Sequence, residues 1–444
     1  MNNTLDLFDQ TFASLERAAG VLGLLQCAWV YDRAIDIDGV RRFHRHLQRG
    51  RLSRRIQRSP VKFGRDRWIA SSGRSALEIV ATPRPRDEFD AWLREQATTP
   101  LDFERGPEWH LAVLPFTDGG AGVSLLIPHC LTDGIGLCEA LADAASGRPD
   151  PISWPDDGSR SRWQALRADA RQTVRDIPGI ARALVAAIGA ARATAGSADS
   201  TTQPPAGPDE LCSVPTTTVF VDADEWDARA HSLGGTSNSL LAGLASRLAQ
   251  RMGRVTADGS VTLAMPVNER TTGDTRANAV TNVGITVDPA SVTTSLREIR
   301  AATKRALIRR HDVPDERWEL LPLTLVSPPW LVRQMVGVAA GSPTNVISSN
   351  LGVIDPAVYR PDGTAADHFA VVPRHPGTTT AVMHRLGGLV SLASGRVHGR
   401  VFVSVHAYHP GRANSDHVLQ QDLSNALQEF SLSAITGWPS PEFV

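Results

Sequence analysis

Cysteine and lysine are scarce in this chain of 444 residues. The four cysteines are Cys27, Cys130, Cys138 and Cys212, and no two of them form a CxxC pair. This usage excludes a disulfide-rich scaffold and the common zinc-binding motifs. Lysine occurs only at Lys62 and Lys304, and neither lies in a GxxxxGK string, which excludes a P-loop. No GxGxxG string follows an expected strand, so the sequence does not indicate dinucleotide binding.

Long hydrophobic runs and an excess of one charge are also absent. No run of about 18 apolar residues occurs, and the best candidate, Leu184–Ala191, is short and lies between Arg182 and Arg192. The first ten residues, MNNTLDLFDQ, carry acidic residues where a signal peptide has a basic segment. Basic and acidic residues number 46 and 47, so no overall field favours nucleic acid as a partner. We therefore expect a soluble cytoplasmic protein.

Short apolar runs alternate with helical periodicity, which is typical of a mixed α/β protein. In the first half the pattern predicts strands over Leu24–Tyr31, Trp109–Pro115 and Gly122–Ile127, and helices over Val40–Gln48 and Gly134–Ala145. In the second half it predicts strands over Thr216–Val221, Ser260–Met265, Val280–Val287, Val346–Ser349, Leu389–Ala393 and Arg400–His406. Helices are predicted there over Ser237–Arg251, with Ser237 or Asn238 as N-cap, and over Ser295–Arg309 and Ser415–Glu429.

The clearest boundary lies near the middle of the chain. A helical stretch, Ser161–Ala195, is interrupted at Pro178 and is followed by Gly196–Pro208, which is rich in Ser, Thr, Pro and Gly without apolar periodicity. The sequence therefore predicts an N-terminal unit over residues 1–195, a crossover linker over residues 196–212 and a C-terminal unit over residues 213–444.

The segment most informative about function is Ser124–Ala140, SLLIPHCLTDGIGLCEA. An apolar strand ends at Pro128, His129 follows it, and Asp133 and Gly134 open a helix, giving an HxxxDG pattern at a strand-to-helix junction. An imidazole there can take a proton from a hydroxyl, amine or thiol. Asp133 could order the loop through a salt bridge or fix the ring, and Gly134 would allow a tight turn. The simpler interpretation is a strand-end histidine followed by an N-cap aspartate.

This segment resembles the histidine motif of the CoA-dependent acyltransferases with the chloramphenicol acetyltransferase fold. That superfamily includes condensation domains of peptide synthetases, polyketide-associated acyltransferases and wax ester synthase/diacylglycerol acyltransferases. The resemblance extends over most of the chain. It includes Pro100–Pro115, Leu233–Leu248, Ala264–Val287 and the Ser-Asn segment Asn345–Gly352.

The resemblance implies an α/β protein of two chloramphenicol acetyltransferase-like subdomains, with mixed sheets, flanking helices and a channel at their interface. His129 would act as general base, Asp133 would have an orienting role next to Gly134, and Arg270 would pair with Asp133. Ser348, Ser349 and Asn350 are the candidates for oxyanion or acceptor contacts, because the segment would face His129 from the second half. The chain has no GxSxG string, so no covalent acyl-enzyme is expected.

The expected reaction moves an acyl group from a CoA or carrier-protein thioester to a small-molecule or lipid acceptor with a hydroxyl or amine, with no cofactor and no metal. Pro128 departs from the motif, since condensation domains and wax ester synthases usually have another histidine there. Two alternatives remain: a stand-alone condensation-type enzyme that uses carrier-bound substrates, and a catalytically silent homologue that binds carriers or lipids.

Two further features of the sequence have simple explanations. Arg41–Arg67 contains 11 basic residues and one acid, Asp66. This segment could dock CoA phosphates, an acidic carrier or anionic lipid in a peripheral membrane contact, but a solvated helix face and turn is the simpler explanation. His398, His406 and His409 lie in or beside expected C-terminal strands, and scattered strand histidines explain them better than a metal site does.

Overall fold

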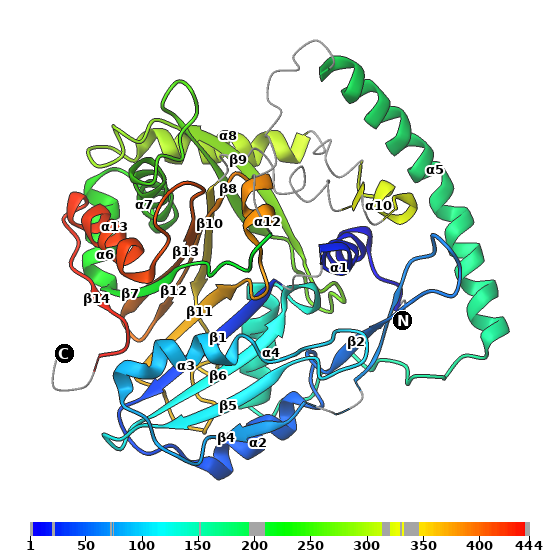
Figure 1. Cartoon of the computed structure of the whole chain (residues 1–444), viewed down its shortest axis with the longest axis horizontal. Helices are drawn as coiled ribbons and strands as arrows, with labels where there is room; N and C mark the ends of the chain where they lie inside the picture. Colours follow the sequence, from blue (N-terminus) through cyan, green and yellow to red (C-terminus); the bar gives the residue numbers. More distant parts are fainter. Residues whose placement is uncertain are drawn as a thin grey trace.

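The computed structural model describes residues 3–19, 23–71, 73, 75–150, 152–194, 209–312, 320–328, 331–332 and 346–439. The expected linker segment Gly196–Pro208 lies outside these residues. The described chain forms two main sheets with helices around them (Figure 1). This is the mixed α/β architecture that the alternation of apolar runs predicts.

The first sheet has five strands in the order β11-β1-β6-β5-β4. Their bounds are His368–Arg374, Leu24–Tyr31, Ala121–Pro128, His110–Pro115 and Leu77–Ile79. Every residue of β1 and β6 is buried, which explains why both strands are continuous apolar runs rather than alternating ones. The accompanying helices are α1 (Leu7–Ala19), α2 (Ile37–Leu47), α3 (Phe89–Gln96) and α4 (Gly134–Ala145), and a small hairpin is formed by β2 (Arg54–Gln57) and β3 (Arg67–Ala70).

The second sheet has seven strands in the order β14-β7-β13-β12-β10-β8-β9. Their bounds are Ile435–Thr436, Thr216–Asp222, Arg400–Tyr408, Leu389–Val397, Val346–Val353, Val261–Asn268 and Val280–Val287. The helices of this half are α6 (Ala223–Ser232), α7 (Ser237–Arg251), α8 (Arg297–Asp312), α12 (Thr380–Arg385) and α13 (Asp416–Glu429). One face of the sheet packs on α7 at strands β8, β10 and β12, and the apolar residues of that face include Val346 and Leu392.

One strand joins the two halves directly. β11 lies late in the sequence, yet it pairs antiparallel with β1, from Leu24 opposite Arg374 to Val30 opposite His368. The division of the chain into residues 1–195 and 213–444 stays a prediction, but the sheets themselves do not follow it, because the later part supplies an edge strand to the first sheet. Phe220 and Phe402, on the face of the second sheet opposite α7, belong to the core of the first sheet.

The predicted strands and helices named above are confirmed, with bounds that differ by a few residues at most ends. Two local expectations are wrong. The N-cap of α7 is Thr236, whose side chain accepts from Ser239 N, rather than Ser237 or Asn238. Helix α5 (Arg162–Thr194) continues through Pro178, although proline removes one backbone hydrogen bond there. Contacts with the body hold the helix before the proline, through the ion pairs of Asp169 and Asp176, and after it, where Ala183 is buried. Among the described residues, no helix is both long and apolar enough to cross a membrane.

Candidate active site around His129

His129 begins the short 3-10 turn His129–Leu131 at the end of β6. Its backbone N–H donates to Gly23 O at 2.7 Å, which fixes the turn against the start of β1. The ring lies beside Phe12 of α1, with centroids 5.5 Å apart. Its Nδ1 atom is enclosed and has no hydrogen-bond partner among the described groups. A buried polar atom without a partner is costly. Since Nδ1 is enclosed while the residue as a whole is half-buried, a substrate has to approach the ring away from Nδ1.

Gly23 marks the point where His129, Glu16 and His375 meet. A methyl group added at Gly23 would lie 3.9 Å from His129 Cβ and 3.8 Å from both Glu16 Oε1 and His375 Nε2. The sheet register explains the meeting, because Leu24 pairs with both Pro128 and Arg374. The strands β6 and β11 therefore end on either side of β1, and the next residue of each is a histidine.

His375 stacks on His406 of β13, with ring centroids 4.8 Å apart and planes 5° apart. Both ring nitrogens of His406 and Nδ1 of His375 are enclosed without hydrogen-bond partners. Burial, reinforced by the neighbouring His129, lowers the pKa of His375 to about 4. Burial likewise lowers the pKa of His406, with His375 and Arg374 adding to the effect. Both rings are therefore neutral at physiological pH, and the sheet interface presents uncharged imidazoles beside His129.

Glu16 completes the group from α1. Burial raises the pKa of Glu16 to about 8, although hydrogen bonds from Cys130 and Gly23 oppose the shift. Its Oε2 atom is enclosed without a partner. The side chain is therefore predominantly a neutral acid at pH 7, able to donate as well as accept a hydrogen bond.

The Asp133 carboxylate forms its hydrogen bonds with groups other than the His129 imidazole. Oδ1 caps α4 by accepting from Gly136 N at 2.6 Å. Oδ2 accepts from Arg270 Nη2 at 2.6 Å and from Ala279 N at 2.8 Å. The Asp133 and Arg270 side chains are only 3% and 2% exposed. The expected pair therefore forms as a buried ion pair that joins the start of α4 to the second half of the chain.

The loop at Ala277–Ala279 is held against the motif by further bonds. Arg270 Nη2 donates to Ala277 O at 2.8 Å, and Asp9 of α1 accepts from Ala277 N and Asn278 N at 2.8 and 2.9 Å. Asn278 Nδ2 then donates to His129 O at 3.1 Å. Burial and the neighbouring Asp6 raise the pKa of Asp9. Asp133 and Asn278 thus order the backbone on which His129 stands.

Gly134 is needed for space rather than for a special turn. It is not among the described glycines with a positive φ, and an added Cβ would lie 2.7 Å from Leu351 Cδ2. At Gly136 an added Cβ would lie 2.8 Å from Arg270 Nη2. The two glycines allow the β10 segment and the Arg270 guanidinium to approach the first turn of α4.

The three candidate donors on β10 do not share one environment. Ser348 is buried on the face that also contains Val346 and packs on α7. Asn350 Nδ2 donates to Asn238 Oδ1 at the start of α7. Since side chains alternate along a strand, Ser349 points to the opposite face, which carries Ser391 and His406 on neighbouring strands. Ser349 is therefore the member of the three on the His406 side.

A cleft of about 510 Å³ borders the motif on the outer side of α4. Its α4 wall includes Ile135, Cys138 and Ala142, which recur at helical spacing, and Leu351 and Arg270 lie on the other side. This volume is typical of a small-molecule site. Burial raises the pKa of Cys138 to about 12, so its thiol is not a nucleophile at neutral pH.

The charged groups of this cleft are balanced. Arg51 pairs with Glu139 at 2.9 Å, Arg148 pairs with Asp143 at 2.8 Å, and Arg270 pairs with Asp133. The cleft therefore offers a largely neutral, partly apolar surface rather than a concentrated positive field.

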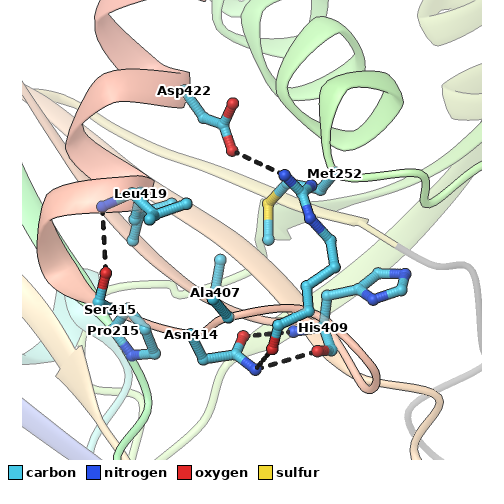
Figure 2. A pocket seen from close by; sticks show the side chains of 11 residues that line it. Pro215, Met252, Ala407, His409, Asn414, Ser415, Leu419 and Asp422 are labelled. Atoms are coloured by element: carbon cyan, nitrogen blue, oxygen red, sulfur yellow. Dashed lines mark hydrogen bonds and ion pairs between the residues drawn. The ribbon is translucent and has the colours of Figure 1, made fainter.

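A second pocket, near His409 and α13, is too small for a substrate. Its free volume is about 10 Å³, less than or near the space of a single water. Figure 2 shows that its polar groups bond to one another: His409 N donates to Asn414 Oδ1 at 2.9 Å, and Asn414 Nδ2 donates to His409 O at 3.0 Å. These contacts stabilise the turn before α13.

The basic segment Arg41–Arg67 is largely occupied within the protein. Ion pairs link Arg41, Arg42, Arg51, Arg55, Arg58, Arg65 and Arg67 to carboxylates. Arg54 is buried and donates to Thr275 O and Leu131 O. The expected solvated surface holds for Arg41, Arg42 and Arg58, which are more than half exposed. The other paired arginines of the segment are at most 18% exposed and link parts of the protein to one another. Among the described residues, no group of three or more His, Cys, Asp or Glu side chains could hold a metal ion.

The sequence motif identified His129, Asp133 and Arg270, but not Glu16, Asn278, His375 or His406. His375 lies three residues after the apolar run Phe369–Val372, directly after the end of β11, as His129 directly follows β6. The apolar run predicts a strand, and a histidine just after a strand is the same signal that identified His129. The position of β11 beside β1 depends on sheet order, which no local pattern reveals.

No protein-family model matches the sequence, and no curated protein is detectably similar to it. Solved structures are similar over nearly the whole chain. The first condensation domain of the calcium-dependent antibiotic synthetase, in complex with a substrate analogue, aligns with a TM-score of 0.57 at 13% identity, covering 97% of each chain. Wax ester synthase/diacylglycerol acyltransferase from Marinobacter aquaeolei VT8 aligns with a TM-score of 0.56 at 16% identity, covering 96% of this chain and 98% of that one.

Polyketide synthase associated protein 5 from Mycobacterium tuberculosis gives a TM-score of 0.55 at 15% identity, covering 96% of this chain and 97% of that one. The expected fold class is confirmed. The chain has the two-subdomain fold of the CoA-dependent acyltransferases, shared by condensation domains and wax ester synthases. At these identities the similarity establishes the fold, and activity has to be argued from the site itself.

Proposed function

We propose that the protein is an acyltransferase that moves an acyl group from a thioester to a hydroxyl or amine, with His129 as general base. The acceptor oxygen or nitrogen attacks the thioester carbonyl carbon while His129 takes the acceptor proton. Collapse of the tetrahedral intermediate breaks the C–S bond, and the imidazolium returns the proton to the leaving thiolate. The step needs no cofactor and no covalent enzyme intermediate.

The observation that carries this proposal is the setting of His129. Its ring stands at the end of a buried strand with an enclosed, unpartnered Nδ1. The backbone below it is held by Asn278, and the adjacent helix start is held by the buried Asp133–Arg270 pair. A simple strand-end histidine needs no such support from the second half of the chain. Preorganisation of this kind is what a general base requires.

Ser349 is the best placed of the three β10 candidates to donate to the oxyanion. It lies on the sheet face that carries His406, whereas Asn350 is engaged by Asn238. A donor aimed at the developing charge is a large part of acyl-transfer catalysis. On the other side of Gly23, the neutral His375 ring is available to hydrogen bond the acceptor.

The cleft beside α4 would hold part of the thioester. Because its arginines are paired with carboxylates, it suits the uncharged acyl or pantetheine portion better than the phosphates of CoA. This charge balance favours a second candidate of the same chemistry, a condensation-type enzyme that takes its thioester from a carrier protein. In that case an acceptor bound to a second carrier, or a free amine, would receive the acyl group.

The test is thioester turnover by the purified protein with acyl-CoA and acyl-carrier-protein donors of several chain lengths. Free thiol is measured with and without alcohol and amine acceptors, and the acylated product is identified by mass spectrometry. We expect acceptor-dependent thiol release that His129→Ala abolishes and the exposed control His231→Ala preserves. Wild-type turnover no higher than the background rate of thioester hydrolysis would indicate a silent homologue that only binds its ligands.

A further inference from the structure

Helix α5 exposes a continuous apolar stripe. It is 33 residues long, about 50 Å at 1.5 Å per residue, and it runs along one side of the molecule, away from both sheets (Figure 1). Large apolar side chains lie exposed along it, from 41% for Leu166 to 80% for Trp163. The set is Trp163, Leu166, Val174, Ile177, Leu184 and Val185.

These side chains share one face. At about 100° per residue, the six positions fall within an arc of about 100°. Intervals of three and four residues produce this arrangement, as in a helix that buries one face against a partner. An exposed apolar surface of this length is unusual on a protein that acts alone in water.

The opposite side of α5 attaches the helix to the body. Asp169 pairs with Arg67 at 2.6 Å, and Asp176 pairs with Arg65 at 2.8 Å. Gly179 lies against Pro322, since an added Cβ would be 3.8 Å from Pro322 Cγ. The apolar stripe is therefore not the surface that α5 uses for packing within the protein.

The charges beside the stripe have one sign. Arg162, Arg167, Arg171, Arg175 and Arg182 are all exposed. Asp169 and Asp176 are the only acids between Arg162 and Val185, and both belong to the inward ion pairs. Four of the arginines, from Arg167 to Arg182, fall in the adjacent arc of about 80°. The outer surface of α5 therefore combines an apolar stripe with a basic flank.

We propose that α5 docks the protein on an anionic lipid surface. A helix with an apolar face, a basic flank and a tryptophan near one end is the kind that lies in the membrane interface without crossing it. Arginine side chains beside the stripe can reach lipid phosphates while their stems cover apolar surface. This proposal does not depend on the acyltransferase activity.

A second copy of the chain fits the α5 stripe less well than an anionic bilayer does. Facing α5 helices would bring two basic flanks together with no exposed acid between Arg162 and Val185 to pair with them. Like charges at a contact oppose association. An anionic bilayer satisfies the apolar and the basic parts of the surface at once.

The test is flotation of the full-length protein with vesicles of phosphatidylcholine alone or of phosphatidylcholine with 30% phosphatidylglycerol. We expect binding to the anionic vesicles that falls with added salt. The triple variant Arg167→Gln/Arg171→Gln/Arg175→Gln should bind roughly 100-fold more weakly, from the usual contribution of each basic residue near such a surface. Val174→Ser/Ile177→Ser should also weaken binding.

The matched control is Arg45→Gln/Arg49→Gln/Arg105→Gln, which removes the same charge from exposed positions outside α5 and should bind like wild type. Equal binding by wild type and both α5 variants would overturn the proposal, as would failure of wild type to bind anionic vesicles at low salt. Dimerisation in solution that the α5 variants abolish, without vesicle binding, would assign the stripe to a second copy instead.

Discussion

At the residue scale, His129 is distinguished by the contacts that hold its backbone in place. Its backbone bonds to Gly23 and Asn278 fix the turn. We predict that His129→Ala lowers kcat by roughly 10²–10⁴, the usual contribution of a positioned general base. Circular dichroism and the melting temperature should stay close to wild type. Wild-type kcat in this variant would remove His129 from the mechanism.

Glu16 gives a prediction about stability and pH. Burial raises the pKa of Glu16 in the folded state to about 8, above its ordinary value of 4.5, so the folded state holds a proton that the unfolded state releases. The stability that this proton provides is complete below pH 4.5 and is lost as pH rises towards 8. Glu16→Gln cannot ionise. Its melting temperature relative to wild type should therefore rise by at least ~2 °C between pH 5 and pH 9.

The control for Glu16 is Glu298→Gln at an exposed position on α8, which should show no such trend. A difference between Glu16→Gln and wild type that is constant across this pH range would contradict a buried, protonated Glu16.

His375 should affect the acceptor more than the thioester. His375→Phe keeps a ring to stack on His406 but removes the hydrogen-bonding nitrogens. Loss of one neutral hydrogen bond predicts a rise of about 2- to 10-fold in the acceptor KM. Thioester hydrolysis without acceptor should stay within about twofold of wild type, and His231→Gln should change neither. An unchanged acceptor KM would limit His375 to a packing role.

At the element scale, the start of α4 depends on a residue more than 130 positions away. Asp133 caps the helix and pairs with Arg270 in a buried contact. Removing one partner leaves an uncompensated charge, which typically costs about 3–5 kcal/mol. We predict that Asp133→Asn and Arg270→Gln each lose stability and activity. In a double-mutant cycle their coupling should be at least ~1 kcal/mol.

The matched pair for this cycle is Asp38 and Arg41, whose side chains are mostly exposed. Its coupling should be below ~1 kcal/mol, as is usual for surface pairs. Absence of coupling between Asp133 and Arg270 would mean that the pair does not order the motif.

Element prediction succeeded where a local pattern sets the structure. β1, β9, α4 and α7 begin and end at the predicted residues, because each has an apolar run or a periodic pattern with a clear boundary. The course of α5 through Pro178 was missed, since distant parts of the chain hold the helix. Before the proline, Asp169 and Asp176 pair with Arg67 and Arg65, and after it Ala183 is buried. The α7 cap was misplaced by one residue because Thr236, Ser237 and Asn238 are all good capping residues.

At the scale of the whole molecule, the site could be predicted only in part. His129, Asp133 and Arg270 follow from a motif and a family resemblance. His375 and Glu16 join them because β11 pairs with β1 and because Glu16 of α1 lies beside Gly23. These are facts of topology, which sequence spacing does not contain. The same topology links the halves through β11, the Asp133–Arg270 pair and the bonds of Asp9 to Ala277 and Asn278.

The central claim is that one acyl-transfer site is built around His129 from both halves of the chain. The most direct measurement inserts a specific protease site within residues 196–208 of the full-length protein, cleaves it, and follows gel filtration and thioester release. We predict that the fragments co-elute and keep acceptor-dependent turnover, because β11 and the ion pair still hold them, and that His129→Ala in the cleaved protein is inactive. After separation in denaturant and refolding apart, neither fragment should turn over a thioester. Turnover by residues 1–195 alone, or full activity of the cleaved His129→Ala protein, would contradict the account.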